Sequence, residues 1–148
     1  MLFGQPQRLS PRLSRFGREI LNIAHVALWT RHIEAQRTFW RDFFSATSNE
    51  KYVSKNRAGF ESYFISLAHG PTIELMALPE LANAPANPEF VGWAHIAIAV
   101  GNVEQVDKMA QKAHQQGRLA SPARWTGDGF YEAVITDPDG NRIELVAE

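Results

Sequence analysis

The chain of 148 residues is 45% hydrophobic, which is enough for one ordinary core or for two small modules that share one. Its formal net charge of −1, and the lack of any apolar run near the about 20 residues of a membrane span, predict a soluble protein that binds a small molecule instead of nucleic acid or membrane. It has no cysteine, which excludes disulfides, thiolate metal sites and a cysteine nucleophile, and which favours a reducing, cytoplasmic location.

Residues 1–20 are rich in arginine, and no acidic residue occurs before Glu19. An arginine-rich, acid-poor leader resembles an organelle transit peptide. A frayed N-terminal arm, or a short helix docked on a partner subunit, is nevertheless the commoner role of such a terminus. We therefore expect an N-terminal arm without chemistry.

The next segment, residues 21–78, predicts a first module of one strand, one helix and three further strands. The first strand is expected at 22–29, and a helix with an aromatic apolar face follows it. Most of that face comes from Ile33, Phe39, Trp40, Phe43 and Phe44. The later strands are expected at about 51–54, 59–66 and 72–77.

A proline-bearing stretch without periodicity, residues 79–91, predicts a linker to a second module at 92–148. In this module Asn102 and Gln105 form a plausible capping box for a helix that ends at Gly117. Strands are expected at about 119–125, 130–136 and 141–147. The chain thus predicts an α+β fold of two βαβββ modules.

The same short signature occurs in both modules, seventy positions apart. Segment 24–28, Ala-His-Val-Ala-Leu, matches segment 94–98, Ala-His-Ile-Ala-Ile, and Ile-Glu-Leu recurs at 73–75 and 143–145. An unpartnered histidine or ionised glutamate inside such an apolar run is costly. A single strand histidine is usually a hydrogen-bonded core residue, but four coincident positions favour metal ligands. We expect His25, Glu74, His95 and Glu144 to hold one divalent ion.

The hairpin near the end of each module predicts which side chains share the metal face. Asp137-Pro138-Asp139-Gly140-Asn141 is typical of a three-residue loop with glycine in the left-handed conformation, which places Val134 opposite Glu144. Alternation then predicts an apolar wall beside the ligands. This wall consists of Trp29, Phe64, Met76, Trp93, Val134 and Val146. We expect the first five of these residues to bind the substrate. A two-residue loop would invert this assignment.

Glu132 is a further acid on the predicted metal face, and the first module has Ser62 at the equivalent position. An asymmetric carboxylate beside a metal could be a general base or could orient the substrate. The alternative is a carboxylate at the rim, solvated or paired with Arg142 or Arg124. The residues leave these two roles equally supported.

The duplicated organisation, the two histidines and the segments Gly92-Trp-Ala-His-Ile-Ala-Ile98 and Asp137-Pro-Asp-Gly-Asn-Arg-Ile-Glu-Leu145 resemble the vicinal oxygen chelate superfamily over residues 21–148. This resemblance implies a curved, half-open, eight-stranded mixed sheet around one metal. It also implies that the ligands are His25, Glu74, His95 and Glu144, contributed by one chain or by two chains of a homodimer. Nitrogen and oxygen donors suit zinc, nickel, cobalt, manganese or iron.

A set of two histidines and two glutamates is most similar to glyoxalase I, which isomerises the hemithioacetal of an α-ketoaldehyde and glutathione. The resemblance implies that Glu144 or Glu74 moves the proton, with Glu132 as a further catalytic candidate. Glyoxalase I carries an arginine and an asparagine for glutathione where this chain has Trp29 and Leu78. A flatter or more apolar substrate is therefore expected. Lys55, Arg57, Arg124 and Arg142 could bind an anion from loops, although such residues are more often solvated surface charges.

Two alternatives of other classes remain open. One is a non-haem iron dioxygenase with a site of two histidines and one carboxylate, although a fourth ligand leaves fewer open positions. The other is a small-molecule-binding protein of the bleomycin-resistance type, which usually lacks the ligand set.

Overall fold

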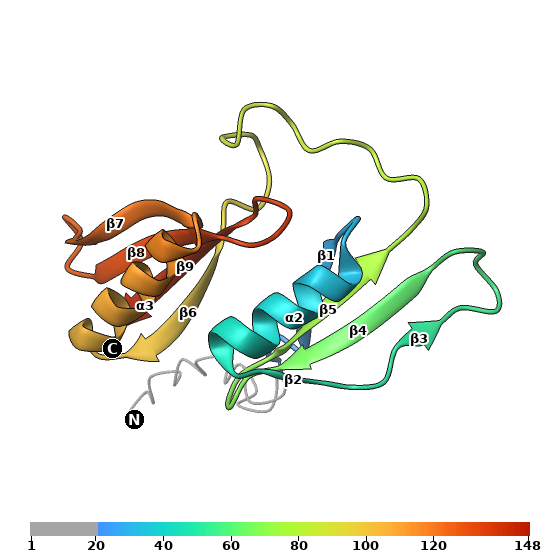
Figure 1. Ribbon diagram of the computed structural model, residues 1–148, viewed down its shortest axis with the longest axis horizontal. Coiled ribbons are helices and arrows are strands. Elements are labelled where there is room, and N and C mark those ends of the chain that lie inside the picture. The colour runs from blue at the N-terminus through green and yellow to red at the C-terminus, as the bar shows by residue number, and fades with distance from the viewer. Residues whose placement is uncertain (1–20) are drawn as a thin grey trace, which may run out of the picture.

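The computed structural model describes residues 21–148, which form two modules, each with one sheet and one helix (Figure 1). The predicted N-terminal arm, residues 1–20, lies outside the described residues. A long linker arches from the end of the first module to the start of the second. No helix in the described part of the chain is long and apolar enough to cross a membrane.

The first module contains a five-stranded sheet with the strand order β1-β5-β4-β2, and β3 also pairs with β4. Its elements are β1 (His25–Trp29), α2 (Ile33–Phe44), β2 (Thr47–Ser48), β3 (Tyr52–Val53), β4 (Glu61–Ser66) and β5 (Thr72–Ala77). β1 runs parallel to β5, and β4 is antiparallel to β5. Strand β2 was not predicted, because two residues are too few to show an alternating pattern.

The second module repeats this plan with a four-stranded sheet of order β6-β9-β8-β7. Its elements are β6 (Ile96–Gly101), α3 (Val103–Gln115), β7 (Leu119–Trp125), β8 (Tyr131–Thr136) and β9 (Arg142–Ala147). The prediction of an α+β fold with two βαβββ modules is confirmed. In place of one continuous eight-stranded sheet, residues 21–148 form two sheets of five and four strands, and no strand of one module pairs with a strand of the other.

Local sequence explains where α3 begins and how the last hairpin turns. The Asn102 side chain accepts a hydrogen bond from the Gln105 backbone N–H at 2.9 Å and so caps α3. Between β8 and β9, the Gly140 N–H donates to the Asp137 carbonyl at 3.0 Å, and Gly140 has a φ of 85°. The predicted three-residue loop is confirmed, and Val134 pairs with Glu144 as expected.

Each helix covers one face of its own sheet and leaves the other face open. In the first module, the covered face consists of Tyr63, Ile65, Ile73 and Leu75, all of which are buried. In the second module, Ala133, Ile135, Ile143 and Leu145 are buried with Val106, Ala110 and Ala113 of α3. Because side chains alternate along a strand, Glu74 and Glu144 belong to the open faces.

A buried polar cluster joins the two modules within the chain. The Gln36 amide of α2, fully buried, donates to the Asp137 carboxylate at 2.8 Å and to the Asp139 carboxylate at 2.7 Å. The Thr30 hydroxyl also donates to Asp139. We call these four residues the inter-module cluster; it ties the first module to the β8–β9 turn of the second.

The two helices also contact each other across the modules. Lys112 of α3 donates to the Asp42 carbonyl of α2 at 2.9 Å, and its ammonium lies 4.9 Å from the centre of the Phe43 ring. The Arg118 guanidinium lies 5.1 Å from the centre of the Phe39 ring. The modules therefore meet through their helical sides, and the open sheet faces are not turned toward each other.

Replacing Gln36 with alanine is expected to lower the free energy of unfolding by about 1–3 kcal/mol, because it removes two hydrogen bonds to carboxylates and leaves the buried Trp40 indole N–H without its acceptor. Urea denaturation monitored by circular dichroism measures this change. Gln111→Ala, on the exposed side of α3, is the matched control and should change stability by less than about 0.5 kcal/mol. Equal effects of the two substitutions would contradict this role of the cluster.

Candidate metal centre

In the second module, a histidine and a glutamate lie side by side on the open face. His95 directly precedes β6, and Glu144 lies in the parallel neighbour β9, where it pairs with Ala97. Their Nε2 and Oε2 atoms are 3.2 Å apart, and the side chains are 42% and 16% exposed. The parallel pairing of β6 with β9 is thus what brings these two residues together.

The first module repeats this arrangement. His25 is the first residue of β1, and Glu74 of β5 pairs with Ala27, so the offset between the strands is the same. His25 Nε2 and Glu74 Oε2 are 3.5 Å apart. The Phe64 ring packs edge-on against the His25 imidazole, with ring centroids 5.7 Å apart. The duplicated sequence signature therefore corresponds to a duplicated geometry.

Each histidine–glutamate pair fits two ligands of one metal ion. Two donor atoms about 2.1 Å from a tetrahedral ion lie about 3.4 Å from each other. The observed separations of 3.2 and 3.5 Å match this distance. Imidazole nitrogen and carboxylate oxygen are also donors that divalent transition metals accept. The chemistry of the donor set and its spacing thus agree with half of a metal site in each module.

The two pairs do not come together within one chain. Among residues 21–148, no group of three or more histidine, aspartate or glutamate side chains is placed to hold a metal ion. The inter-module cluster and the contact between α2 and α3 explain this, since they hold the modules by the faces opposite to the ligands. Within one chain, the structure therefore brings each histidine together only with the glutamate of its own module, and the convergence of all four ligands stays a prediction.

Glu132 lies next to Glu144, the carboxylate of the His95–Glu144 pair. Its carboxylate is 12% exposed, and the Arg124 guanidinium approaches it at 3.5 Å. Burial raises the pKa of Glu144, and a hydrogen bond shared with Glu132 raises it further, whereas His95 lowers it. Glu132 is thus paired with Arg124, one of the two partners expected for it, and also contacts Glu144; a cation between these groups would relieve the repulsion between the two carboxylates.

An aromatic wall surrounds the pair of the first module. Phe64 and Met76 lie on the Glu74 face, as predicted, since Phe64 pairs with Glu74 and Met76 with Ser62. Trp29, 44% exposed, packs edge-on against Phe60 at 6.2 Å. The Arg57 guanidinium lies 5.7 Å from the centre of the Trp29 ring. A cation therefore sits over the tryptophan that stands where glyoxalase I carries its arginine.

The second pair opens into a pocket of about 320 Å³. Its lining consists of His95, Ala120, Ser121, Arg124, Val134, Arg142 and Glu144. Val134 is present as predicted. Trp93 is not part of this lining: it precedes β6 instead of lying on the strand, and it is 95% exposed. The strand alternation that placed it beside His95 does not extend to it.

The two arginines of this pocket were expected to bind an anion from loops, but both lie on strands. Arg124 lies in β7 and Arg142 is the first residue of β9. Arg142 and Glu144 are two positions apart on one strand, so alternation alone could have placed them on the same face. Arg124 required the pairing of β7 with β8, which sets it opposite Glu132.

Known proteins share this architecture over nearly the whole described chain. The uncharacterized protein YwkD of Bacillus subtilis is 27% identical over 127 residues, which are 84% of this chain and 94% of that protein. A glyoxylase/bleomycin resistance protein/dioxygenase domain from Frankia sp. EAN1pec superposes with a TM-score of 0.73 at 13% identity, over 86% of this chain and 92% of that one. The trypanothione-dependent glyoxalase I of Leishmania major superposes with a TM-score of 0.67 at 17% identity, over 86% and 87%.

The model of one protein family covers most of the sequence. It matches residues 22–145, which include both modules and all four candidate ligands. This agrees with the duplicated βαβββ plan and with the equivalent histidine–glutamate pairs. The chain therefore belongs to the Glyoxalase/Bleomycin resistance protein/Dioxygenase superfamily, whose members share the vicinal oxygen chelate fold.

Proposed function

We propose that this protein is a metal-dependent lyase or isomerase of the glyoxalase I type, acting on a small substrate with vicinal oxygens. The observation that carries the proposal is the pair of equivalent contacts, His25 to Glu74 and His95 to Glu144. Together they supply two imidazoles and two carboxylates, which is the complete ligand set that the resemblance to glyoxalase I implies. The dioxygenases of the same superfamily need only three protein ligands.

We further propose that the metal centre is assembled from two copies of the chain. The His25–Glu74 pair of one copy would face the His95–Glu144 pair of the other copy. Both open sheet faces are available for this, because the two modules of one chain contact each other elsewhere. A two-fold dimer formed in this way contains two equivalent sites. The aromatic wall around Trp29 and Phe64 would then lie opposite the charged wall around Arg124 and Glu132.

We assign the other steps of the reaction to residues around this metal site. A divalent ion held at this site would polarise adjacent substrate oxygens and stabilise the negative charge that develops on them. Glu144 or Glu74 is placed to move a proton between neighbouring carbons of the substrate, since each carboxylate lies at the base of the open face. Glu132, in contact with Glu144, orients that carboxylate or the substrate. The aromatic wall excludes water from the reacting atoms.

The proposal is tested by elemental analysis combined with an assay on methylglyoxal and glutathione. Full-length protein is expected to hold about one divalent ion per site and to convert the hemithioacetal to its thioester, with loss of turnover on chelation and recovery on adding the metal back. Trp29 and Leu78 stand in place of the arginine and asparagine of glyoxalase I. We therefore expect the KM for the glutathione adduct to be higher than that of glyoxalase I. A protein that binds no metal after loading would overturn the proposal. Metal without turnover would exclude this adduct as the substrate.

A further inference from the structure

Two arginines stand beside the metal ligands of the second module. Arg142 lies two positions before Glu144 on β9, and Arg124 lies on β7 opposite Glu132. Both line the pocket of about 320 Å³ that also contains His95 and Glu144. The equivalent of Arg142 in the first module is Thr72, seventy positions earlier. The two arginines therefore stand beside the His95–Glu144 pair, and the His25–Glu74 pair has no counterpart of Arg142.

Acidic residues lie close to both arginines: Glu132 beside Arg124, and Glu89 in the neighbouring pocket with Arg142. The pocket lining has two arginines and one glutamate. Glu132 lies 3.5 Å from the Arg124 Nη2, which is longer than a strong charge-assisted bond, and Arg124 also donates to the Ser121 hydroxyl at 3.0 Å. Arg142 forms no ion pair with any acidic residue of the described range 21–148. Arg142 is therefore available to bind an anion, whereas Arg124 shares its charge with Glu132.

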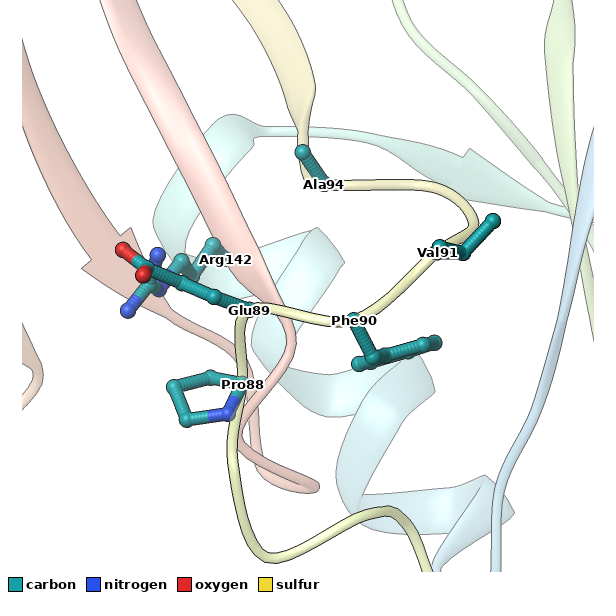
Figure 2. A pocket seen from close by; sticks show the side chains of 6 residues that line it. All are labelled: Pro88, Glu89, Phe90, Val91, Ala94 and Arg142. Atoms are coloured by element: carbon teal, nitrogen blue, oxygen red, sulfur yellow. The ribbon is translucent and has the colours of Figure 1, made fainter.

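A second pocket adjoins the first, and Arg142 is part of both. It has a volume of about 460 Å³ and is lined by Pro88, Glu89, Phe90, Val91, Ala94 and Arg142. Figure 2 shows the residues that line it, with the side chains of Glu89 and Arg142 overlapping in this view. Most of the linker side chains in it are apolar. A molecule bound at Arg142 can therefore extend its apolar part over the linker.

We propose that the substrate is an organic acid: its carboxylate binds between Arg124 and Arg142, its vicinal oxygens bind at the His95–Glu144 pair, and its apolar remainder extends toward Phe90. The proposal rests on the proposed function, because it assigns the vicinal oxygens to that site. Guanidinium groups match the planar geometry of a carboxylate.

The test is isothermal titration of the zinc-loaded, full-length protein with two probes, 3,4-dihydroxybenzoate and 4-methylcatechol. Both present vicinal oxygens on an aromatic ring, and only the first has a carboxylate. Two charge-assisted contacts are expected to make the acid bind about 10- to 100-fold more tightly than the neutral probe. In the double variant Arg124→Gln/Arg142→Gln this preference should disappear, while the affinity for 4-methylcatechol stays the same.

Arg41→Gln is the matched control, because Arg41 lies on α2 and its guanidinium pairs with Asp42; it should keep the wild-type preference. Equal affinity for the two probes in the wild type, or an unchanged preference in the double variant, would overturn the carboxylate site. Failure of both probes on protein shown to contain zinc would instead count against the proposed function. Benzoate then tests the arginines alone: weaker binding to the double variant supports the proposal, and equal binding overturns it.

Discussion

Heterodimers built from two metal-free variants are expected to recover about half of the wild-type metal content per chain. One chain carries His25→Ala with Glu74→Ala, and the other carries His95→Ala with Glu144→Ala; each variant alone should bind no metal, because every site lacks two of its four ligands. In a heterodimer with shared sites, one site has lost all four ligands and the other keeps all four. Elemental analysis after purification through two different affinity tags measures this recovery.

The reason for this expectation is geometric. Each chain presents a histidine–glutamate pair at 3.2 or 3.5 Å, and the contacts between α2 and the second module keep the two pairs apart. The control is the same two-tag purification with a single variant on both chains, which should contain no metal. If both ligand pairs had to come from one chain, the heterodimer would contain none either, and that result would refute assembly between copies.

Trp40→Ala is expected to lower the free energy of unfolding by about 3–5 kcal/mol, the largest stability effect that we predict for a single side chain. Trp40 is 1% exposed, stacks on Phe44 with ring centroids 4.9 Å apart and packs edge-on against Phe39. Its indole N–H also donates to the Gln36 side chain at 3.2 Å. Its loss would therefore open a cavity beneath α2 and disturb the inter-module cluster.

Chemical denaturation at a fixed protein concentration measures this effect, because the proposed dimer would make apparent stability depend on concentration. Trp40→Phe should cost less, since it retains most of the ring and loses the hydrogen bond. Trp125→Ala is the control for removing a tryptophan; that side chain is 67% exposed, and its loss should change stability by less than about 1 kcal/mol. A Trp40→Ala protein as stable as the Trp125→Ala protein would show that the helix does not depend on this packing.

Periodicity predicted the elements well where they are long and regular. The helix over Ile33–Phe44 and the last hairpin were both visible in the sequence, because an aromatic stripe at helical spacing and an Asp-Pro-Asp-Gly-Asn turn depend on neighbouring residues alone. The register of that hairpin then placed Val134 opposite Glu144. Trp93 was placed less well, because the alternation of a strand was extended to a residue that lies before it.

Arg124 and Arg142 show what the alternation of side chains along single strands can and cannot predict. Arg142 shares a strand with Glu144, so its face follows from alternation, yet Arg124 reaches the site only because β7 pairs with β8 through two register shifts. A β-bulge changes which side chains face the site, and nothing local in the sequence specifies it. Glu132 differs from Arg124 in this respect, because the register of the last hairpin already placed it on the Glu144 face, and only its contact with Arg124 depends on β7.

By itself the sequence determined the family resemblance, the two modules and the four candidate ligands, because a motif repeated at a constant offset of seventy residues must occupy equivalent places in two equivalent folds. Only the tertiary structure decided how the modules sit together. Gln36 lies 101 and 103 positions before Asp137 and Asp139 along the chain, yet its amide donates to both carboxylates. A buried amide needs hydrogen-bond acceptors, and the two carboxylates of the second module supply them. This contact places the helices between the modules and leaves the two histidine–glutamate pairs on the outer faces.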